Sequence, residues 1–282
     1  MQLFIPTRDR VNAQYTWDNL TPALRAITKL CVPEAEIQQH LDLGRNAVVR
    51  PPVKLAGVRQ WIVSELADQT QPVIMMDDDL GFFNRRDPGA YNLQPISKHP
   101  DLNVLFQDLN DLVALEGYAH AGLSPRQGNN RLFPETRVYN TRINAVHCVN
   151  PAVLSKEGVA YDTVDMMEDY HVTLSLLERG YGNVALADRA WDQVKGSGAP
   201  GGFSHYRNRE TQTAAANRLA ELHPQFVTVV EKTPKTGSGD FSGTRTDVRI
   251  QWKKAYESSQ NPPKVVAVEV APVGNPTGVR EN

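Results

Sequence analysis

Residues Val73 to Met76 form a short apolar run that ends abruptly in three consecutive carboxylates, Asp77, Asp78 and Asp79. An unbroken apolar run is typical of a strand buried on both faces of an open α/β sheet, and ligands bind such sheets just beyond the carboxyl ends of the strands. Three adjacent acids repel one another unless a positive charge lies between them. Because Mg²⁺ and Mn²⁺ prefer carboxylate and diphosphate oxygens, we expect Asp77 and Asp79, on one side of an extended backbone, to hold a divalent metal. A solvated acidic turn is the alternative.

The segments before and after this run alternate between strand and helix patterns. The predicted order is a strand at 3–5, a helix that follows the N-cap Thr21 with an apolar stripe reaching Leu30, a strand at 47–49, a helix at 57–67 and a strand at 73–76. This order predicts an α/β fold in which the acids end the third strand of an N-terminal nucleotide-binding half. An amphipathic helix around 102–113 and alternating residues at 137–149 predict the strands of a second half.

Composition limits the partners of the chain. The formal net charge of −2 gives no general attraction for nucleic acid or membrane, so contact with a polyanion must be local. Local basic stretches contain Arg126, Arg131, Arg137 and Arg142, and then Arg245, Arg249, Lys253 and Lys254. The two cysteines, Cys31 and Cys148, are interpreted as packing residues of a reducing compartment. Without a signal-like or membrane-spanning apolar stretch, we expect a cytoplasmic protein with no membrane contact.

A second acidic cluster opens a helix whose apolar face begins at Tyr170. Asp165 and Glu168 have the spacing of a capping box, which accounts for Glu168 without any catalytic role. Asp169 has two interpretations of equal weight. It could complement the helix dipole, or it could act as a general base that accepts the proton of an attacking hydroxyl.

The glycine-rich stretch at 196–202 is the most flexible segment by composition, and it could be a linker or a mobile active-site loop. His205 follows it, where an imidazole could close over a metal as a further ligand. The neighbouring Lys195 and Arg207 could neutralise the charge of a departing diphosphate.

Together these elements resemble nucleotide-sugar glycosyltransferases of the GT-A fold. Phe4–Arg8, Met75–Asp79 and Glu168–Tyr170 more narrowly resemble the TET/JBP-associated glycosyltransferases, a family found in phages. The resemblance spans roughly residues 1–207 by the order of the motifs. It implies a GT-A-like α/β domain with one continuous mixed sheet at 1–230, divided into a nucleotide-sugar-binding half at 1–90 and an acceptor half at 91–230. A partly loosely held C-terminal extension would follow at 231–282.

The resemblance implies a metal-dependent transfer from a UDP-sugar to a hydroxyl acceptor. Asp77, Asp79 and His205 would hold Mn²⁺ or Mg²⁺ on the diphosphate, and Asp169, with Glu168 beside it, would deprotonate the acceptor. The residues implied in binding the nucleotide sugar are Pro6, Thr7, Arg8, Arg10, Arg59, Asp77, Asp78, Lys195 and Arg207. The pattern decides neither the sugar, nor inversion against retention, nor the oligomeric state.

The implied acceptor is 5-hydroxymethylcytosine in DNA, in the host cytoplasm if a phage encodes the chain. A base in DNA must leave the stack to react, so Tyr139, Phe203 or Tyr206 could serve as stacking platforms while the basic stretches contact phosphates. Protein, polysaccharide or small-molecule acceptors are alternatives, because the net charge is not that of a strongly basic DNA-binding domain. The competing functions are a metal-dependent phosphohydrolase or nuclease, and a binding module without turnover.

Overall fold

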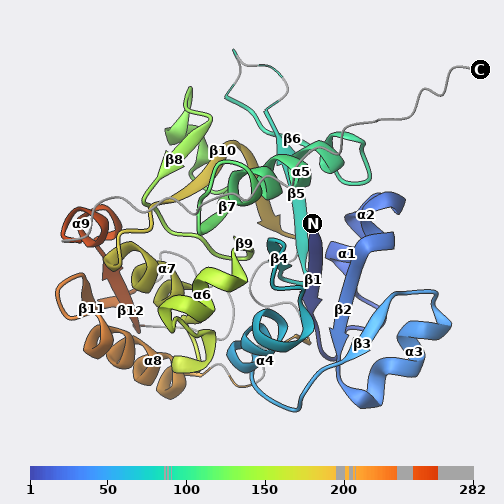
Figure 1. The fold of residues 1–282 in the computed structure, drawn as a ribbon, viewed down its shortest axis with the longest axis horizontal. Helices are drawn as coiled ribbons and strands as arrows, with labels where there is room; N and C mark the ends of the chain where they lie inside the picture. The colour runs from blue at the N-terminus through green and yellow to red at the C-terminus, as the bar shows by residue number, and fades with distance from the viewer. Residues whose placement is uncertain are drawn as a thin grey trace, which may run out of the picture.

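One large mixed sheet organises the chain in the computed structural model, which describes residues 1–85, 87, 89, 91–194, 201–202, 206, 208–233 and 244–259 (Figure 1). The strand order is β3 (Ala47–Val49), β2 (Thr28–Val32), β1 (Gln2–Pro6), β4 (Val73–Met76), β9 (Val146–Val149), β7 (His120–Pro125), β10 (Asn183–Gln193), β5 (Leu80–Asn84) and β6 (Gln94–Pro95), with β8 (Arg137–Tyr139) paired to β10. The first four strands are parallel, and antiparallel pairing begins between β4 and β9. The predicted α/β class with one continuous mixed sheet is confirmed.

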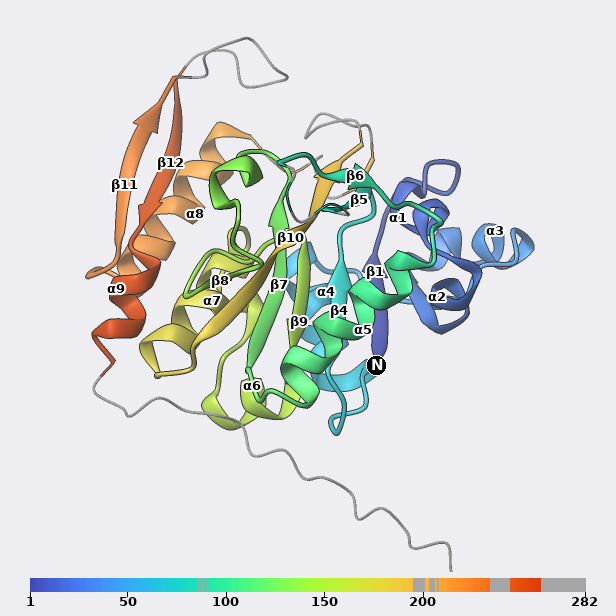
Figure 2. The ribbon, with the colours of Figure 1, turned by 90° about the horizontal axis from the view of Figure 1, so that it is seen from above.

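The central strands are buried on both faces, as the apolar run at 73–76 predicts. Leu3 and Ile74 face a core formed with α1 (Tyr15–Asn19), α2 (Pro22–Ile27) and α5 (Asp101–Ala114). Phe4 and Met75 face the opposite core, formed with α4 (Leu55–Trp61), η2 (Ile62–Leu66), α6 (Pro151–Glu157) and α7 (Glu168–Glu178). Figure 2 shows α5 lying across the strands on its side of the sheet. The short elements η1 (Glu34–Glu36), α3 (Ile37–Asp42), η3 (Asn129–Leu132) and η4 (Tyr161–Thr163) lie in the connections.

One strand was missed by sequence reasoning. Thr21 caps α2 as predicted, since its side chain accepts a hydrogen bond from the Leu24 amide at 3.2 Å. The helix does not continue to Leu30, however, because the chain turns at Thr28 into β2. Leu30 then pairs with Ile5 of β1 on one side and with β3 on the other. The acids therefore follow the fourth strand of the chain rather than the third.

The C-terminal elements pack on α7 and lie on the far side of the molecule from α3 (Figures 1 and 2). They are α8 (Arg209–Leu222), the antiparallel pair β11 (Val227–Lys232) and β12 (Arg245–Ile250), and α9 (Trp252–Glu257). Leu174 and Leu177 of α7 form a third core with them. Residues 260–282 of the expected, partly loosely held extension lie outside the part of the chain described here.

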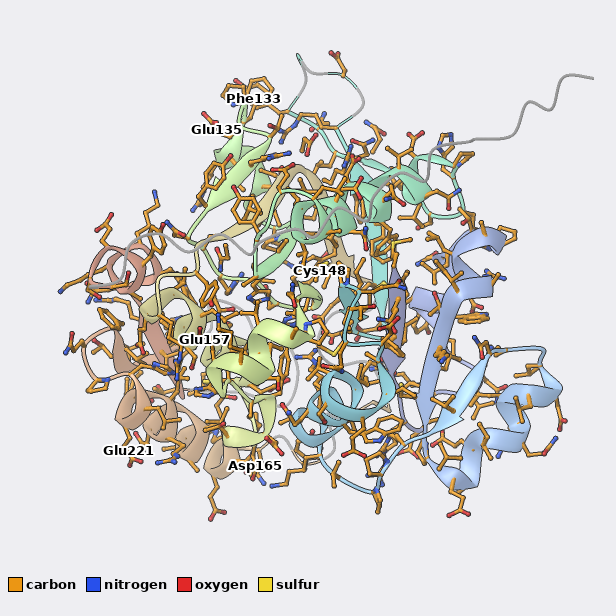
Figure 3. All side chains as sticks on the ribbon, viewed as in Figure 1. Phe133, Glu135, Cys148, Glu157, Asp165 and Glu221 are labelled. Carbon is orange, nitrogen blue, oxygen red and sulfur yellow. The ribbon has the colours of Figure 1, made fainter. Side chains whose placement is uncertain are left out.

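Both cysteines are buried and free, in agreement with a packing role; Cys148 lies near the centre of the molecule (Figure 3). Within the described ranges, no helix combines the length and the apolar character needed to cross a bilayer.

Candidate active site

The acid triplet lies in the turn that joins β4 to β5, at the carboxyl end of the central parallel strands. This corrects the expectation of an extended backbone, because β4 ends at Met76 and a turn forms at Asp78 and Asp79. The turn is tied to its surroundings by backbone hydrogen bonds. The Asp77 amide donates to the Ala145 carbonyl at 2.9 Å, and the Asp79 carbonyl accepts from the Val194 amide at 2.9 Å.

Arg10 compensates the charge of two of the three acids. Its Nη1 donates to Asp78 and lies 3.3 Å from Oδ2 of Asp79, and all three side chains are buried. Asp78 also accepts a hydrogen bond from Thr7 Oγ1 at 2.5 Å. Burial raises the pKa of Asp78 to about 7 in spite of Arg10, and burial also raises the pKa of Asp79. Thr7 and Arg10, both implied in nucleotide binding, thus lie directly against the acid turn.

Arg59 joins the acid turn to the second acidic cluster. Its Nη2 donates to Asp77 Oδ1 at 2.6 Å, and its Nη1 donates to Glu168 Oε1 at 2.6 Å. Burial opposes the charge of Arg59, but Glu168, Asp77 and Asp169 outweigh it and raise the pKa of the guanidinium. The two acidic groups, distant in sequence, therefore meet across one buried cation.

The start of α7 corrects the predicted capping box. Met167, with φ of 61°, occupies the N-cap position, and no side chain caps the helix. Asp165 instead pairs with Lys54 at the surface, where Figure 3 labels it. Glu168 turns to Arg59, since a buried guanidinium left without a carboxylate costs far more than an unfilled cap.

Asp169 follows Glu168 in the first turn of α7 and is partly buried. Its Oδ1 accepts a hydrogen bond from the Tyr170 amide at 3.0 Å. Burial, followed by the charge of Glu168, raises the pKa of Asp169 to about 7. A carboxylate of that pKa accepts a proton far more effectively at neutral pH than an ordinary aspartate does.

The carboxylates of the turn fit a divalent cation. Asp79 Oδ1 is buried and has no hydrogen-bond partner among the described residues, so it is an anionic oxygen that a cation would satisfy. Asp77, with 30% of its side chain exposed, is open to solvent beside it. The ranges the structure describes contain no group of three His, Cys, Asp or Glu residues able to hold a metal. The predicted third ligand, His205, lies outside those ranges.

A cleft of about 890 Å³ opens where the loops after β1, β2 and β3 meet, and Arg8 and Asp9, which line it, directly precede Arg10 in the chain. Its lining residues are Arg8, Asp9, Pro33, Glu34, Ala35, Glu36, Val49, Arg50, Pro51, Pro52, Val53, Lys54, Trp61 and Tyr206. Of the residues predicted to bind the nucleotide sugar, Arg8 lines the cleft, whereas Pro6 is buried at the end of β1. Arg50 was missed, although it directly follows β3, which is the same strand-end signal that identified the acids.

The end of the glycine-rich stretch packs on the loop after β1. The Gly202 amide donates to the Arg8 carbonyl at 2.7 Å. A Cβ on Gly201, whose φ is +82°, would lie 2.6 Å from the Asp9 carbonyl oxygen, so only glycine allows this approach. Lys195 and Arg207, predicted to neutralise the diphosphate, lie outside the described residues.

The family model described as TET-Associated Glycosyltransferase matches residues 1–202, which include the acid turn, Arg59 and Asp169. The chain belongs to this family. This TET-associated glycosyltransferase is also similar to two crystal structures of S. aureus TarS 1–349, one of them in complex with UDP-GlcNAc. Identities are 12% and 11% and TM-scores 0.47 and 0.45, with 78% of this chain covered in both cases and 67% and 66% of TarS. No curated protein sequence matches the chain.

In this TET-associated glycosyltransferase, we expect Arg59→Met to lower the free energy of unfolding by about 3–5 kcal/mol, because Glu168 would keep a buried charge and Asp77 a half-buried one without a partner. Urea denaturation measures the change. The matched control is Arg137→Met, which removes an exposed guanidinium that binds Glu116 at 2.6 and 2.8 Å and should cost less than about 1 kcal/mol. Equal losses in the two variants would contradict the bridging role of Arg59.

Proposed function

We propose that this chain transfers a sugar from a UDP-sugar to the hydroxymethyl group of 5-hydroxymethylcytosine in DNA, with the help of Mn²⁺ or Mg²⁺. Membership of the TET-associated glycosyltransferases supports sugar transfer as the reaction. The observation that carries the rest is the meeting of the acid turn with Glu168 and Asp169 across Arg59. This arrangement supports a cation-binding oxygen and a proton acceptor at one site.

The side chains divide the work as follows. Asp77 and Asp79 would hold the metal, which would neutralise the charge that develops on the departing diphosphate. Arg10 keeps Asp78 engaged in an ion pair, so Asp78 supports the turn. Arg59 likewise engages Glu168, which leaves Asp169 as the carboxylate that accepts a proton.

In an inverting transfer, the acceptor oxygen forms a bond to the anomeric carbon as the bond from that carbon to the diphosphate oxygen breaks. The proton of the acceptor hydroxyl passes to a carboxylate oxygen of Asp169, whose pKa of about 7 suits a base at neutral pH. In a retaining transfer, the same carboxylate would orient the acceptor. UDP leaves in both cases.

The nucleotide would occupy the cleft lined by Arg8, Arg50 and Tyr206, next to the acid turn. The guanidinium of Arg8 supports binding of an anionic donor there. We retain Lys195, His205 and Arg207 as proposed contacts to the diphosphate and metal. We also retain the division into halves at residues 90 and 230, the extension at 231–282 and a cytoplasmic location as parts of this proposal.

The DNA acceptor is supported by the remaining basic side chains. Arg137 is engaged by Glu116 in two hydrogen bonds, whereas Arg249 on β12 is exposed. Lys253 and Lys254 on α9 are also exposed, and both line an open hollow with residues of the turn after β8. These cations are placed to contact phosphates of an acceptor strand that approaches from the α9 side.

The deciding experiment is transfer from a panel of UDP-sugars to DNA containing 5-hydroxymethylcytosine, with and without Mn²⁺, read by mass spectrometry of the digested nucleosides. We expect a mass gain of one sugar that requires the metal. Metal-dependent release of UDP without a mass gain on the DNA nucleosides would support sugar transfer but contradict DNA as the acceptor. Full transfer in the presence of a chelator would discard the metal. Phosphoester cleavage without sugar transfer would instead favour the competing hydrolase.

A further inference from the structure

Three aromatic rings and two guanidinium groups lie close together near β5. Strands β5 and β6 form one end of the sheet (Figure 1). We call Phe83, Arg85, Tyr91, Arg126 and Phe133 the aromatic-arginine patch. The Arg126 guanidinium lies 4.4 Å from the centre of the Phe83 ring, and the Arg85 guanidinium lies 5.2 Å from that of Phe133. The Tyr91 and Phe133 ring centres are 4.7 Å apart. Figure 3 shows Phe133 at the outer tip of the segment that leads to β8.

The patch is open to solvent. Tyr91 is 64% exposed and the Arg126 side chain 49%, while Phe83 and Phe133 are half-buried. Arg85 is buried beneath the rings, where its Nη2 donates to Asn129 Oδ1 at 2.7 Å. A single exposed ring needs no explanation, but rings stacked with guanidiniums form a surface that suits nucleobases and phosphates together.

Strand β5 connects the patch to the acid turn. Phe83 is the fourth residue of β5, which begins at Leu80 directly after the acid turn. A Cβ on Gly81 would lie 3.7 Å from both the Phe83 ring and the Val194 side chain, so Gly81 and Phe83 share one face of the sheet. Arg126 also lies 3.3 Å from Asp192, which is paired with Gly81 across the sheet.

We propose that the aromatic-arginine patch holds the stretch of DNA next to the acceptor nucleotide as a single strand, with Tyr91 stacked on a base and Arg126 on a phosphate. This inference rests on the DNA acceptor of the proposed function. Rings can stack only on bases that have left the double helix, so the patch favours unpaired over duplex acceptor.

The test is fluorescence anisotropy with the full chain and a labelled oligonucleotide that carries one 5-hydroxymethylcytosine, either single-stranded or annealed. We expect Tyr91→Ala and Arg126→Gln each to weaken binding of the single strand about tenfold. Arg126→Gln should also reduce the slope of log K against log salt by about 0.7, whereas Tyr91→Ala should leave the slope unchanged.

Two matched controls lie outside the patch. Leu115→Ala removes an exposed apolar side chain, at 66% exposure and at the end of α5. Arg218→Gln removes a guanidinium of 52% exposure that lies 3.3 Å from Glu221, close to the setting of Arg126. Both should bind the single strand within about twofold of the unsubstituted chain, and all four variants should hydrolyse UDP-sugar at the unsubstituted rate.

The outcomes separate this inference from the proposed function. The unsubstituted chain could transfer sugar to DNA while Tyr91→Ala and Arg126→Gln bind the single strand like the controls. This result would refute the DNA-binding role of the patch and leave the proposed function intact. Tighter binding of the duplex than of the single strand would also overturn it. If the unsubstituted chain releases UDP but neither binds nor modifies DNA, the DNA acceptor fails and the patch fails with it.

Discussion

Replacing Asp169 with asparagine should lower kcat by about 10²- to 10⁴-fold, while the affinity for UDP-sugar stays within about twofold. The amide keeps the size of the side chain and can still accept from the Tyr170 amide, but it cannot take up the proton of the acceptor hydroxyl. Steady-state transfer and calorimetric titration with UDP-sugar measure the two quantities. Near-normal transfer by this variant would contradict the general base and support the alternative, in which Asp169 only complements the helix dipole.

The pH dependence of kcat/KM tests the role of Asp169 independently. Burial and Glu168 raise the pKa of Asp169 to about 7, so the protonated, inactive form accumulates as the pH falls below that value. We therefore expect kcat/KM to fall tenfold per pH unit on the acid side of about 7, and this limb should be absent in Asp169→Asn. Asp165→Asn is the control, since Asp165 lies four residues earlier, is 70% exposed and pairs only with Lys54 among the described contacts.

Asp79→Ala should abolish metal-dependent transfer, with a loss of about 10³-fold or more, because the metal supplies several kcal/mol of stabilisation to the departing diphosphate. The fold should survive, since Asp79 Oδ1 has no hydrogen-bond partner among the described residues and Arg10 keeps its contact with Asp78. Titration with Mn²⁺, followed by its electron paramagnetic resonance signal, should show weakened binding.

The matched control for this result is Asp78→Asn. Asp78 is engaged by Arg10 and Thr7, so its replacement should leave Mn²⁺ binding within a fewfold of the unsubstituted chain. An Asp79→Ala variant that transfers sugar at the normal rate without metal would refute the proposed site. If only Asp78→Asn lost Mn²⁺ binding, the metal ligand would be Asp78, and the proposed assignment to Asp79 would be wrong.

The sequence predicted strands correctly where one physical constraint determined the residue types. Strands buried on both faces must be apolar at every position, and this identified β1 and β4 from Leu3–Ile5 and Val73–Met76. Strand β2 was missed because the spacing of Leu24, Ile27 and Leu30 continues the helical period beyond the true end of α2. Only the pairing of β2 between β1 and β3 ends that helix, and such pairing is tertiary.

The candidate site shows the same limit. Residue types at strand and helix ends indicated the acids, and the resemblance to the family indicated Arg59. They did not show that Arg59 binds Asp77 and Glu168 together, because these partners lie 18 and 109 residues away in the chain. The capping-box pattern at Asp165 and Glu168 was therefore mistaken for a local interaction, although each carboxylate pairs with a cation on the α4 side.

Because Arg59 binds both acidic groups, the energetic effects of substitutions in the two groups should not be additive. A substitution at Asp77 leaves more of the charge of Arg59 to Glu168, and a substitution at Glu168 leaves more of it to Asp77, so the energetic effects of the two changes overlap. The donor and acceptor ends of the site are thus one electrostatic unit. Asp169 shares no hydrogen bond with Arg59 in the described set of contacts, but its charge also raises the pKa of Arg59. Asp79, which pairs with Arg10 instead, is therefore the position at which the proposed metal ligand can be measured apart from this unit.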